Sequence, residues 1–334
     1  MALKSLVRSI ATMLLVLCAS GAHAAAGAVR TVAEFPTTGP IDLPEGLAID
    51  QRGTLYVGLL GSGRVIKIAR DGTQSLLTQF DLGNRADEKP SAVLGLAMYR
   101  RDLYSVLLTH NRPGAPAHGV WRIRPDGSQE LVAAFPDAAG EPNQIAIDRK
   151  GNIYVTDSSL GAVWRIERGG RSAVKWVEDS RLQPKSPSDN PCNVTTFAGG
   201  ANGLAFGPRG DLYVASANRG SIVRIEIDRR SGKPTVRDHL QDCQRLTGLD
   251  HIAFDIRGNL YAARNVANEL VRISPSKEIE VLASGGAGLH FPSNVVFGTA
   301  HRGRSALYFT NLGPAVEHRA LKVLDVGVAG VPLQ

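Results

Sequence analysis

The sequence predicts an all-β protein, a six-bladed β-propeller with four-stranded blades. The first observation is a phrase that occurs six times: an apolar strand, a tight polar turn and a second strand with a Leu-Tyr or Ile-Tyr core in most copies. The copies begin at Pro44, Val93, Pro142, Ala201, Leu249 and Pro292. The second observation is their spacing, which is 49, 49, 59, 48 and 43 residues between equivalent positions. Repeats of this length with several strands are typical of propellers, in which each unit buries its faces against its neighbours.

Each unit supplies four strands. In the first unit these are expected over residues 46–50, 54–60, 64–72 and 75–80. The third strand alternates apolar and polar side chains, as in Ile66-Lys67-Ile68, which is the period-2 signal of a half-buried strand. A Gly-containing turn such as Arg52-Gly53 joins the first strand to the second.

The ring is expected to close with strands from both ends of the chain. The sixth unit lacks a fourth strand in order, while residues 29–35 (VRTVAEF) resemble a fourth strand and precede the first unit. We therefore expect this N-terminal strand to complete the last blade, which removes an exposed sheet edge. Residues 25–334 form a single domain on this interpretation.

The first 24 residues have the features of a signal peptide. Lys4 and Arg8 form a charged start, residues 13–18 an apolar middle, and Ala22-His23-Ala24 a cleavage site. The apolar run is too short to span a membrane, and no later stretch is long enough. The mature protein is therefore expected to be periplasmic or secreted.

The charge pattern argues against a nucleic-acid partner. The net charge is +7, but basic residues are scattered among acidic ones, with no basic stripe and no interleaved aromatic residues. A small molecule is the expected partner instead.

Two cysteines remain after cleavage, because Cys18 lies within the signal peptide. Cys192 and Cys243 precede the inner strands of adjacent units, and an exported chain favours a disulfide between them. Two unpaired thiols remain the alternative.

One equivalent position recurs at the start of every inner strand and carries oxygen ligands in four units. In chain order it holds Glu45, Leu94, Asn143, Asn202, Asp250 and Ser293. Inner strands surround the central channel, so these side chains are expected to converge at one opening. Carboxylate and amide oxygens suit Ca²⁺, and without a His or Cys cluster zinc is disfavoured. The alternative is that these residues only cap turns.

The same residues carry a family resemblance. Residues 45–49 (EGLAI), 202–204 (NGL) and 250–258 (DHIAFDIRG) resemble motifs of the SMP-30/gluconolactonase family of six-bladed lactonases. The resemblance implies that Glu45, Asn202 and Asp250 hold a divalent metal, with Ca²⁺ expected and Mg²⁺, Mn²⁺ or Zn²⁺ as alternatives. It also implies that Asn143 helps to hold substrate and that Asp250 is the general base of lactone or ester hydrolysis.

Two residues depart from the family pattern. Glu141 stands where sugar-lactone enzymes often have Arg, and His251 stands where Gly is usual. An acidic side chain at 141 suits an anionic sugar poorly, so the resemblance supports the reaction class more than the substrate. His110, His118 and His290 fall in expected rim loops. His110 and His290 are candidates for substrate contact, although each also fits a surface histidine without function.

Two other functions remain open. An NHL-type propeller would bind a protein, peptide or glycan without chemistry, and the repeated strands fit that class equally well. A strictosidine-synthase-like propeller would use an acidic residue without metal. The polar residues at four equivalent positions favour the hydrolase over the binding propeller, which does not require them, and metal dependence separates it from the strictosidine-synthase-like enzyme. The fold alone does not decide, because propellers host unrelated functions.

Overall fold

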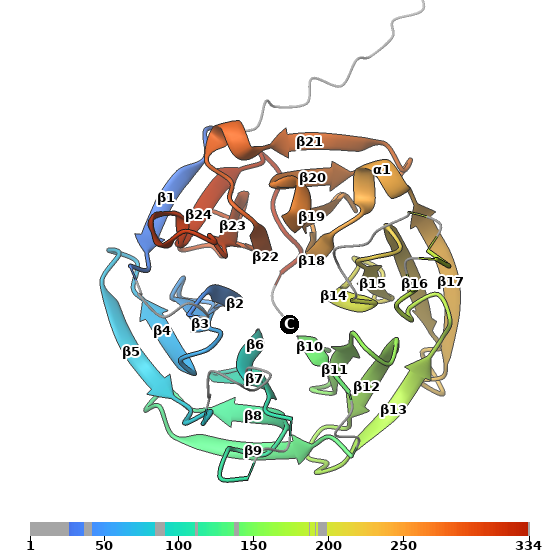
Figure 1. Ribbon diagram of the computed structural model, residues 1–334, viewed down its shortest axis with the longest axis horizontal. Helices are drawn as coiled ribbons and strands as arrows, with labels where there is room; N and C mark the ends of the chain where they lie inside the picture. The colour runs from blue at the N-terminus through green and yellow to red at the C-terminus, as the bar shows by residue number, and fades with distance from the viewer. Residues whose placement is uncertain are drawn as a thin grey trace, which may run out of the picture.

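The protein folds as a ring of six blades around a central axis (Figure 1). The structure, a computed structural model, describes residues 27–36, 42–83, 91–110, 113–136, 140–186, 188–190, 192 and 199–332. Each blade is a four-stranded antiparallel sheet, so the predicted six-bladed propeller is confirmed. The expected signal peptide, residues 1–24, lies outside the described residues.

The strands follow the six repeats in order. Blade 1 comprises β2 (Pro44–Ile49), β3 (Leu55–Leu59), β4 (Arg64–Ile68) and β5 (Gln74–Gln79). Blade 2 comprises β6 (Ala92–Tyr99), β7 (Asp102–Leu108), β8 (Gly119–Ile123) and β9 (Gln129–Ala134). Blade 3 comprises β10 (Pro142–Ile147), β11 (Ile153–Asp157), β12 (Ala162–Ile166) and β13 (Ala173–Glu178).

The second half of the ring repeats this plan. Blade 4 comprises β14 (Ala201–Phe206), β15 (Leu212–Ser216), β16 (Ser221–Ile227) and β17 (Pro234–Gln241). Blade 5 comprises β18 (Leu249–Phe254), β19 (Leu260–Arg264), β20 (Glu269–Ile273) and β21 (Ile279–Ala283). Blade 6 comprises β22 (Pro292–Phe297), β23 (Ala306–Asn311), β24 (Ala320–Asp325) and β1 (Arg30–Glu34). The short helices are α1 (Cys243–Leu246), η1 (Asn265–Ala267), η2 (Gly285–Ala287) and η3 (Val316–His318).

The two ends of the chain meet in blade 6, as predicted. Strand β1 runs antiparallel to β24, with Arg30 opposite Val323 and Glu34 opposite Ala320. The N-terminal strand is therefore the outer strand of the last blade, and pairing it there covers the edge of β24.

An aspartate organises the recurring turn between the first and second strands. Asp255 accepts hydrogen bonds at Oδ1 from the backbone N–H of Asn259 (2.9 Å) and at Oδ2 from the Tyr261 hydroxyl (3.0 Å). Gly258 in the same turn has φ of +86°, a conformation that side chains disfavour. The same arrangement is built on Asp50 and on Asp148. The Asp, Gly and Tyr of the repeated phrase thus shape the turns of blades 1, 3 and 5.

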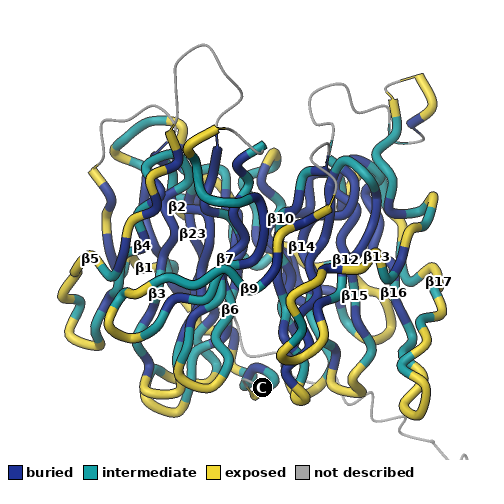
Figure 2. The backbone as a smooth tube through the Cα atoms, turned by 90° about the horizontal axis from the view of Figure 1, so that it is seen from below, coloured by how far each residue is buried: buried dark blue, intermediate teal, exposed yellow. Residues whose placement is uncertain are grey.

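The hydrophobic core lies between blades (Figure 2). On one side of blade 1, Leu55 and Val57 pack in a buried cluster with Leu321 of blade 6. On its other side, Val65 packs with Leu107 of blade 2. Each blade therefore depends on both neighbours to bury its faces, as the repeat predicted. No helix in the described part of the chain is long and apolar enough to cross a membrane.

Candidate metal centre and active site

Every inner strand has a bulge at the same place, next to the recurring polar position. In β2 the register with β3 shifts between Pro44 and Leu47, and the inner strands of the other five blades shift at the equivalent position. A bulge turns a side chain away from the regular alternation of a strand. The residues inside the six bulges begin with Glu45, Leu94, Asn143, Asn202, Asp250 and Ser293. The sequence repeat therefore predicted a set of structurally equivalent positions.

Glycine lets neighbouring inner strands approach one another at this level. A Cβ on Gly203 would lie 2.2 Å from the carbonyl oxygen of Asp250 in the next blade, and one on Gly46 would lie 2.3 Å from that of Leu94. Both contacts are far shorter than a carbon side chain tolerates. The Asn-Gly pair in the sequence thus lets the strand that carries Asn202 lie close to the strand that carries Asp250.

Two buried carboxylates from different blades interact electrostatically, and each accepts a side-chain hydrogen bond. Glu45 and Asp250 are 6% and 5% exposed, and Ser293 is fully buried. The Ser293 hydroxyl donates a hydrogen bond to Glu45 Oε2, and Asn265 Nδ2 donates to Asp250 Oδ2 at 3.2 Å. Sequence reasoning missed both Ser293 and Asn265. The signal for Ser293 was available, because it occupies the sixth equivalent position.

Burial disfavours the charged forms of both carboxylates. It raises the pKa of Glu45 to about 7, against a smaller opposing effect of the Ser293 hydrogen bond. Burial, and then the charge of Glu45, raise the pKa of Asp250 well above its usual range. Among the described residues, neither carboxylate forms an ion pair with Lys, Arg or His. The pair therefore lacks the positive charge that usually accompanies buried acids.

Among the described residues, two amide oxygens at the equivalent positions of blades 3 and 4 have no hydrogen-bond partner. Asn202 is 3% exposed, and its Oδ1 is buried and unpaired. Asn143 donates through Nδ2 to Ser158 Oγ (3.2 Å), which leaves its own buried Oδ1 unpaired. Buried oxygen atoms of this kind normally have a partner, and a cation would provide one.

The donor set fits a hard cation. Glu45 and Asp250 supply carboxylate oxygens, while Asn202 and Asn143 supply amide oxygens. Within the described ranges, no three His, Cys, Asp or Glu side chains gather as a metal-binding group, so the amides would have to complete the coordination. Oxygen ligands with two carboxylates are typical of Ca²⁺. These side chains therefore fit the divalent metal that the resemblance implies.

Two threonines hold the backbone of the site across blade boundaries. Thr156 of β11 accepts the N–H of Gln144 (3.0 Å) and donates to the carbonyl oxygen of Asn202 (2.5 Å). Thr310 of β23 connects the bulge of β22 to the carbonyl oxygen of Glu45 in the same way (3.2 Å). Both threonines are fully buried. The sequence repeat gave no signal for this role, because each threonine donates to a carbonyl oxygen of a neighbouring blade.

The histidines occupy different environments. His118 lies in the loop that precedes β8, as expected, but its side chain is buried, and its Nδ1 accepts the N–H of Thr109 (3.3 Å). His290 stacks on His318 with ring centroids 3.5 Å apart, and burial lowers the pKa of His290. His110 has φ of +51° and is half-buried. The substrate contacts expected of His110 and His290 remain predictions.

His251, the residue that replaces the usual Gly, packs between blades. Its Nδ1 lies 2.9 Å from the carbonyl oxygen of Val295, and burial lowers the pKa of the ring to about 4. A carbonyl only accepts, so Nδ1 carries the proton of the neutral ring.

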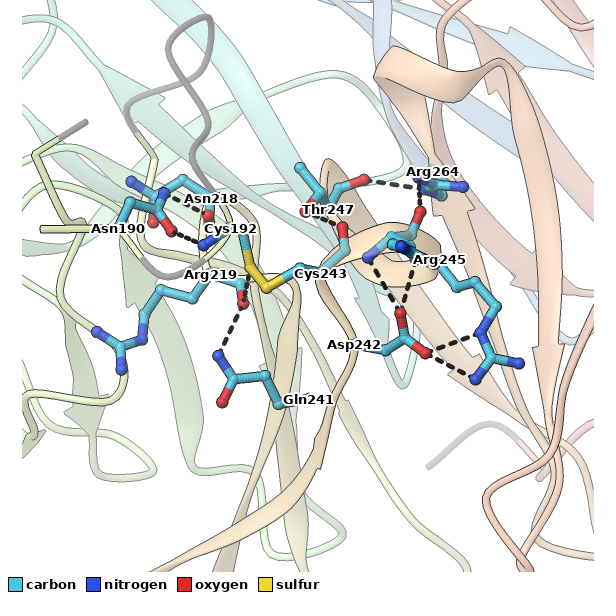
Figure 3. Close-up of a disulfide and its surroundings, with 11 residues drawn as sticks. Asn190, Cys192, Asn218, Arg219, Gln241, Asp242, Cys243, Arg245, Thr247 and Arg264 are labelled. Atoms are coloured by element: carbon cyan, nitrogen blue, oxygen red, sulfur yellow. Dashed lines mark hydrogen bonds and ion pairs between the residues drawn. A yellow bond between two sulfur atoms is a disulfide. The ribbon is translucent and has the colours of Figure 1, made fainter. Parts of the chain in front are cut away.

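The predicted disulfide is present beside the site (Figure 3). Cys192 and Cys243 are bonded, with their Cα atoms 4.8 Å apart. The bond joins the connection into β14, which carries Asn202, to helix α1, which precedes β18 and Asp250. Asp242 caps α1 by accepting the N–H groups of Gln244 and Arg245. The connections that lead to two candidate ligands are thus covalently joined.

Comparison with known proteins supports the resemblance. The SMP-30/gluconolactonase/LRE-like region matches residues 181–312. This match confirms the resemblance to that family, and the matched residues include Asn202 and Asp250. A second family model, the N-terminal part of strictosidine synthase-like proteins, matches residues 31–68, which contain Glu45. No curated protein matches the chain in sequence.

Solved structures share the fold at low sequence identity. A gluconolactonase from Xanthomonas campestris has a TM-score of 0.62 at 19% identity, covering 89% of this chain and 88% of its own. The calcium-binding protein regucalcin from Agrobacterium tumefaciens has a TM-score of 0.62 at 15% identity, covering 91% and 95%. Virginiamycin B lyase from Staphylococcus aureus has a TM-score of 0.55 at 16% identity, covering 89% and 99%. The shared architecture thus serves more than one chemistry.

Proposed function

We propose that this protein is an exported, metal-dependent hydrolase that opens a lactone or ester. The observation that carries the proposal is a set of four oxygen-bearing side chains at equivalent positions: two buried carboxylates, for which the described part of the chain supplies no cation, and two buried amide oxygens, for which it supplies no hydrogen-bond donor. The match to the SMP-30/gluconolactonase/LRE-like region over residues 181–312 supports the reaction class. The proposed metal is Ca²⁺, with Mg²⁺, Mn²⁺ and Zn²⁺ as alternatives.

Each side chain has a proposed role. Glu45, Asn202 and Asp250 hold the metal, which when bound supplies a positive charge that polarises the substrate carbonyl. Asp250 accepts a proton from the attacking water, and Asn265 orients its carboxylate through the bond to Oδ2. Asn143 presents its unpaired Oδ1 to substrate or water.

The expected substrate is a neutral or apolar lactone or ester rather than an anionic sugar derivative. Glu141 lies two residues before Asn143, and its backbone N–H is held by Asp157 Oδ1 at 3.0 Å. A carboxylate at this position would repel an anionic substrate. Residues 1–24 are proposed to direct export, which agrees with the presence of the Cys192–Cys243 disulfide.

Metal binding and hydrolysis test the proposal in one protein preparation. The mature protein is stripped with EDTA, and its melting temperature and its hydrolysis of a panel of lactones and aryl esters are measured with each of the four metals. We expect Ca²⁺ to raise the melting temperature and the rate of hydrolysis, because it binds the folded state. Neither increase is expected in Glu45→Gln or in Asp250→Asn. Asp250→Asn should lower kcat at least about 100-fold, because it removes the general base. Glu317→Gln, an exposed carboxylate on η3, is the matched control.

A metal-free strictosidine-synthase-like enzyme is the second candidate, favoured by the match over residues 31–68. Melting temperatures that no ion changes would remove the metallohydrolase and leave this candidate and the non-catalytic, protein-binding propeller. Metal binding without hydrolysis of any substrate in the panel would support a calcium-dependent binding propeller instead.

A further inference from the structure

A cavity lies in the central channel on the side away from the polar positions. Its volume is about 590 Å³, and its lining includes His251 and, two residues beyond the polar position, Leu47, Leu204 and Ile252. Glu45 and Asp250 do not line it. We call this cavity the lower chamber, and no role in the proposed hydrolysis accounts for it.

The C-terminal segment forms one wall of the lower chamber. The last described part of the chain, red in Figure 1, runs from blade 6 toward the centre of the ring. The segment 329–332 is held by backbone hydrogen bonds: Ile256 N–H to Ala329 O, Val331 N–H to Phe254 O, and Gly330 N–H to Arg304 O, all 2.9 Å. Because blades 5 and 6 both fix it, this segment is an ordered wall of the chamber.

The chamber combines apolar walls with polar groups at its outer end. Met98, Ile147 and Phe206 are among the side chains that line it. Arg304 and His301 also line it and are exposed, and among the described residues Arg304 forms no ion pair. Small-molecule sites have this composition, with volumes of about 300–1,000 Å³, mostly apolar walls and a few polar groups that set orientation.

We propose that the lower chamber binds a monocarboxylate with an unbranched aliphatic chain. The chain lies along the channel between the inner strands, and the carboxylate pairs with the Arg304 guanidinium at the outer end. This binding does not depend on the proposed metal or hydrolysis, because Arg304 and the metal ligands lie at opposite ends of the inner strands.

A chain-length series tests the apolar half of the proposal. Hexanoate, octanoate and decanoate are titrated in EDTA into the mature protein, residues 25–334, and the heat of binding is measured. Each added methylene should tighten binding roughly fourfold until the chamber is filled. The same affinities are expected for the Glu45→Gln variant, even if that variant has lost metal binding. A series with no dependence on chain length, or no binding of decanoate, would overturn the proposal.

A pair of arginine variants tests the charged half. Arg304→Gln should weaken decanoate binding at least about tenfold and leave decanol binding unchanged, because only the carboxylate uses the guanidinium. Arg257→Gln is the control: Arg257 is exposed on the same end of blade 5 but does not line the chamber. Equal losses in the two variants would show general charge attraction and refute the assigned site.

Discussion

Replacing Glu45 by Gln should stabilise the metal-free protein at pH 8, although it destroys the proposed metal site. Glu45 is 6% exposed, and burial raises its pKa to about 7 from about 4.5. A carboxyl group with a raised folded-state pKa contributes stability that is fully present below about pH 4.5 and lost as the pH rises through 7. Each pKa unit of difference between the folded and unfolded states corresponds to about 1.4 kcal/mol. The free energy of unfolding should therefore fall by about 3 kcal/mol as the pH rises from below 4.5 to above 7.

The assay is urea unfolding followed by tryptophan fluorescence, in EDTA, at pH 5 and pH 8. The free energy of unfolding of Glu45→Gln should exceed that of the wild type by about 3 kcal/mol at pH 8, and by less than about 1 kcal/mol at pH 5. Gln keeps an oxygen that accepts the hydrogen bond from Ser293, so this contact should persist. Glu317→Gln, an exposed carboxylate, should show no pH-dependent difference.

Calcium should reverse the order of stability. At a Ca²⁺ concentration about 100-fold above Kd, the wild type should gain about 2.7 kcal/mol at pH 8 and Glu45→Gln should gain little. If wild type and Glu45→Gln differ equally at pH 5 and pH 8 in EDTA, Glu45 is not desolvated, and the reasoning from its burial is wrong.

Three further substitutions probe how the site is held. Replacing both Cys192 and Cys243 by Ser removes a disulfide between residues with a sequence separation of 51. The free energy of unfolding in urea should then fall by about 4 kcal/mol, because the unfolded chain gains conformational freedom. An unchanged free energy of unfolding under oxidising conditions would mean that the bond does not form in solution. Thr156→Val should lower the free energy of unfolding by about 2 kcal/mol and weaken Ca²⁺ binding in calorimetry, because it leaves the Asn202 carbonyl oxygen without its hydrogen-bond donor. Thr156→Ser keeps the hydroxyl and should retain the stability and the Ca²⁺ affinity of the wild type. Gly203→Ala should weaken Ca²⁺ binding more than Thr156→Val, since its Cβ would contact the Asp250 carbonyl; equal affinity to wild type would show that the blades separate readily.

Local patterns were sufficient to predict the blades, because each repeat carries its own turn chemistry. Asp255, Gly258 and Tyr261 lie within one hairpin, so their hydrogen bonds and backbone conformation depend on a few neighbouring residues. The same locality allowed the missing fourth strand of the last unit to be recognised and its replacement, β1, to be found at the N-terminus.

The polar position was predictable for a related reason. Equivalent residues of a closed ring must lie at one level, so Glu45, Asn143, Asn202 and Asp250 could be grouped from the repeat alone. The loop position of His118 was predicted but its burial was not, because exposure depends on how the loop packs against Phe135 and not on the local sequence.

The sequence by itself determined the number of blades, the closure of the ring and the equivalent positions of the polar side chains, and it favoured a bond between the two cysteines. Only the tertiary structure showed that Ser293 joins Glu45 across the boundary between the last blade and the first, that Asn202 Oδ1 is left unpaired, and that the lower chamber exists. The physical reason is that hydrogen bonding, desolvation and cavity volume depend on distances between blades, whereas the repeat encodes contacts within them.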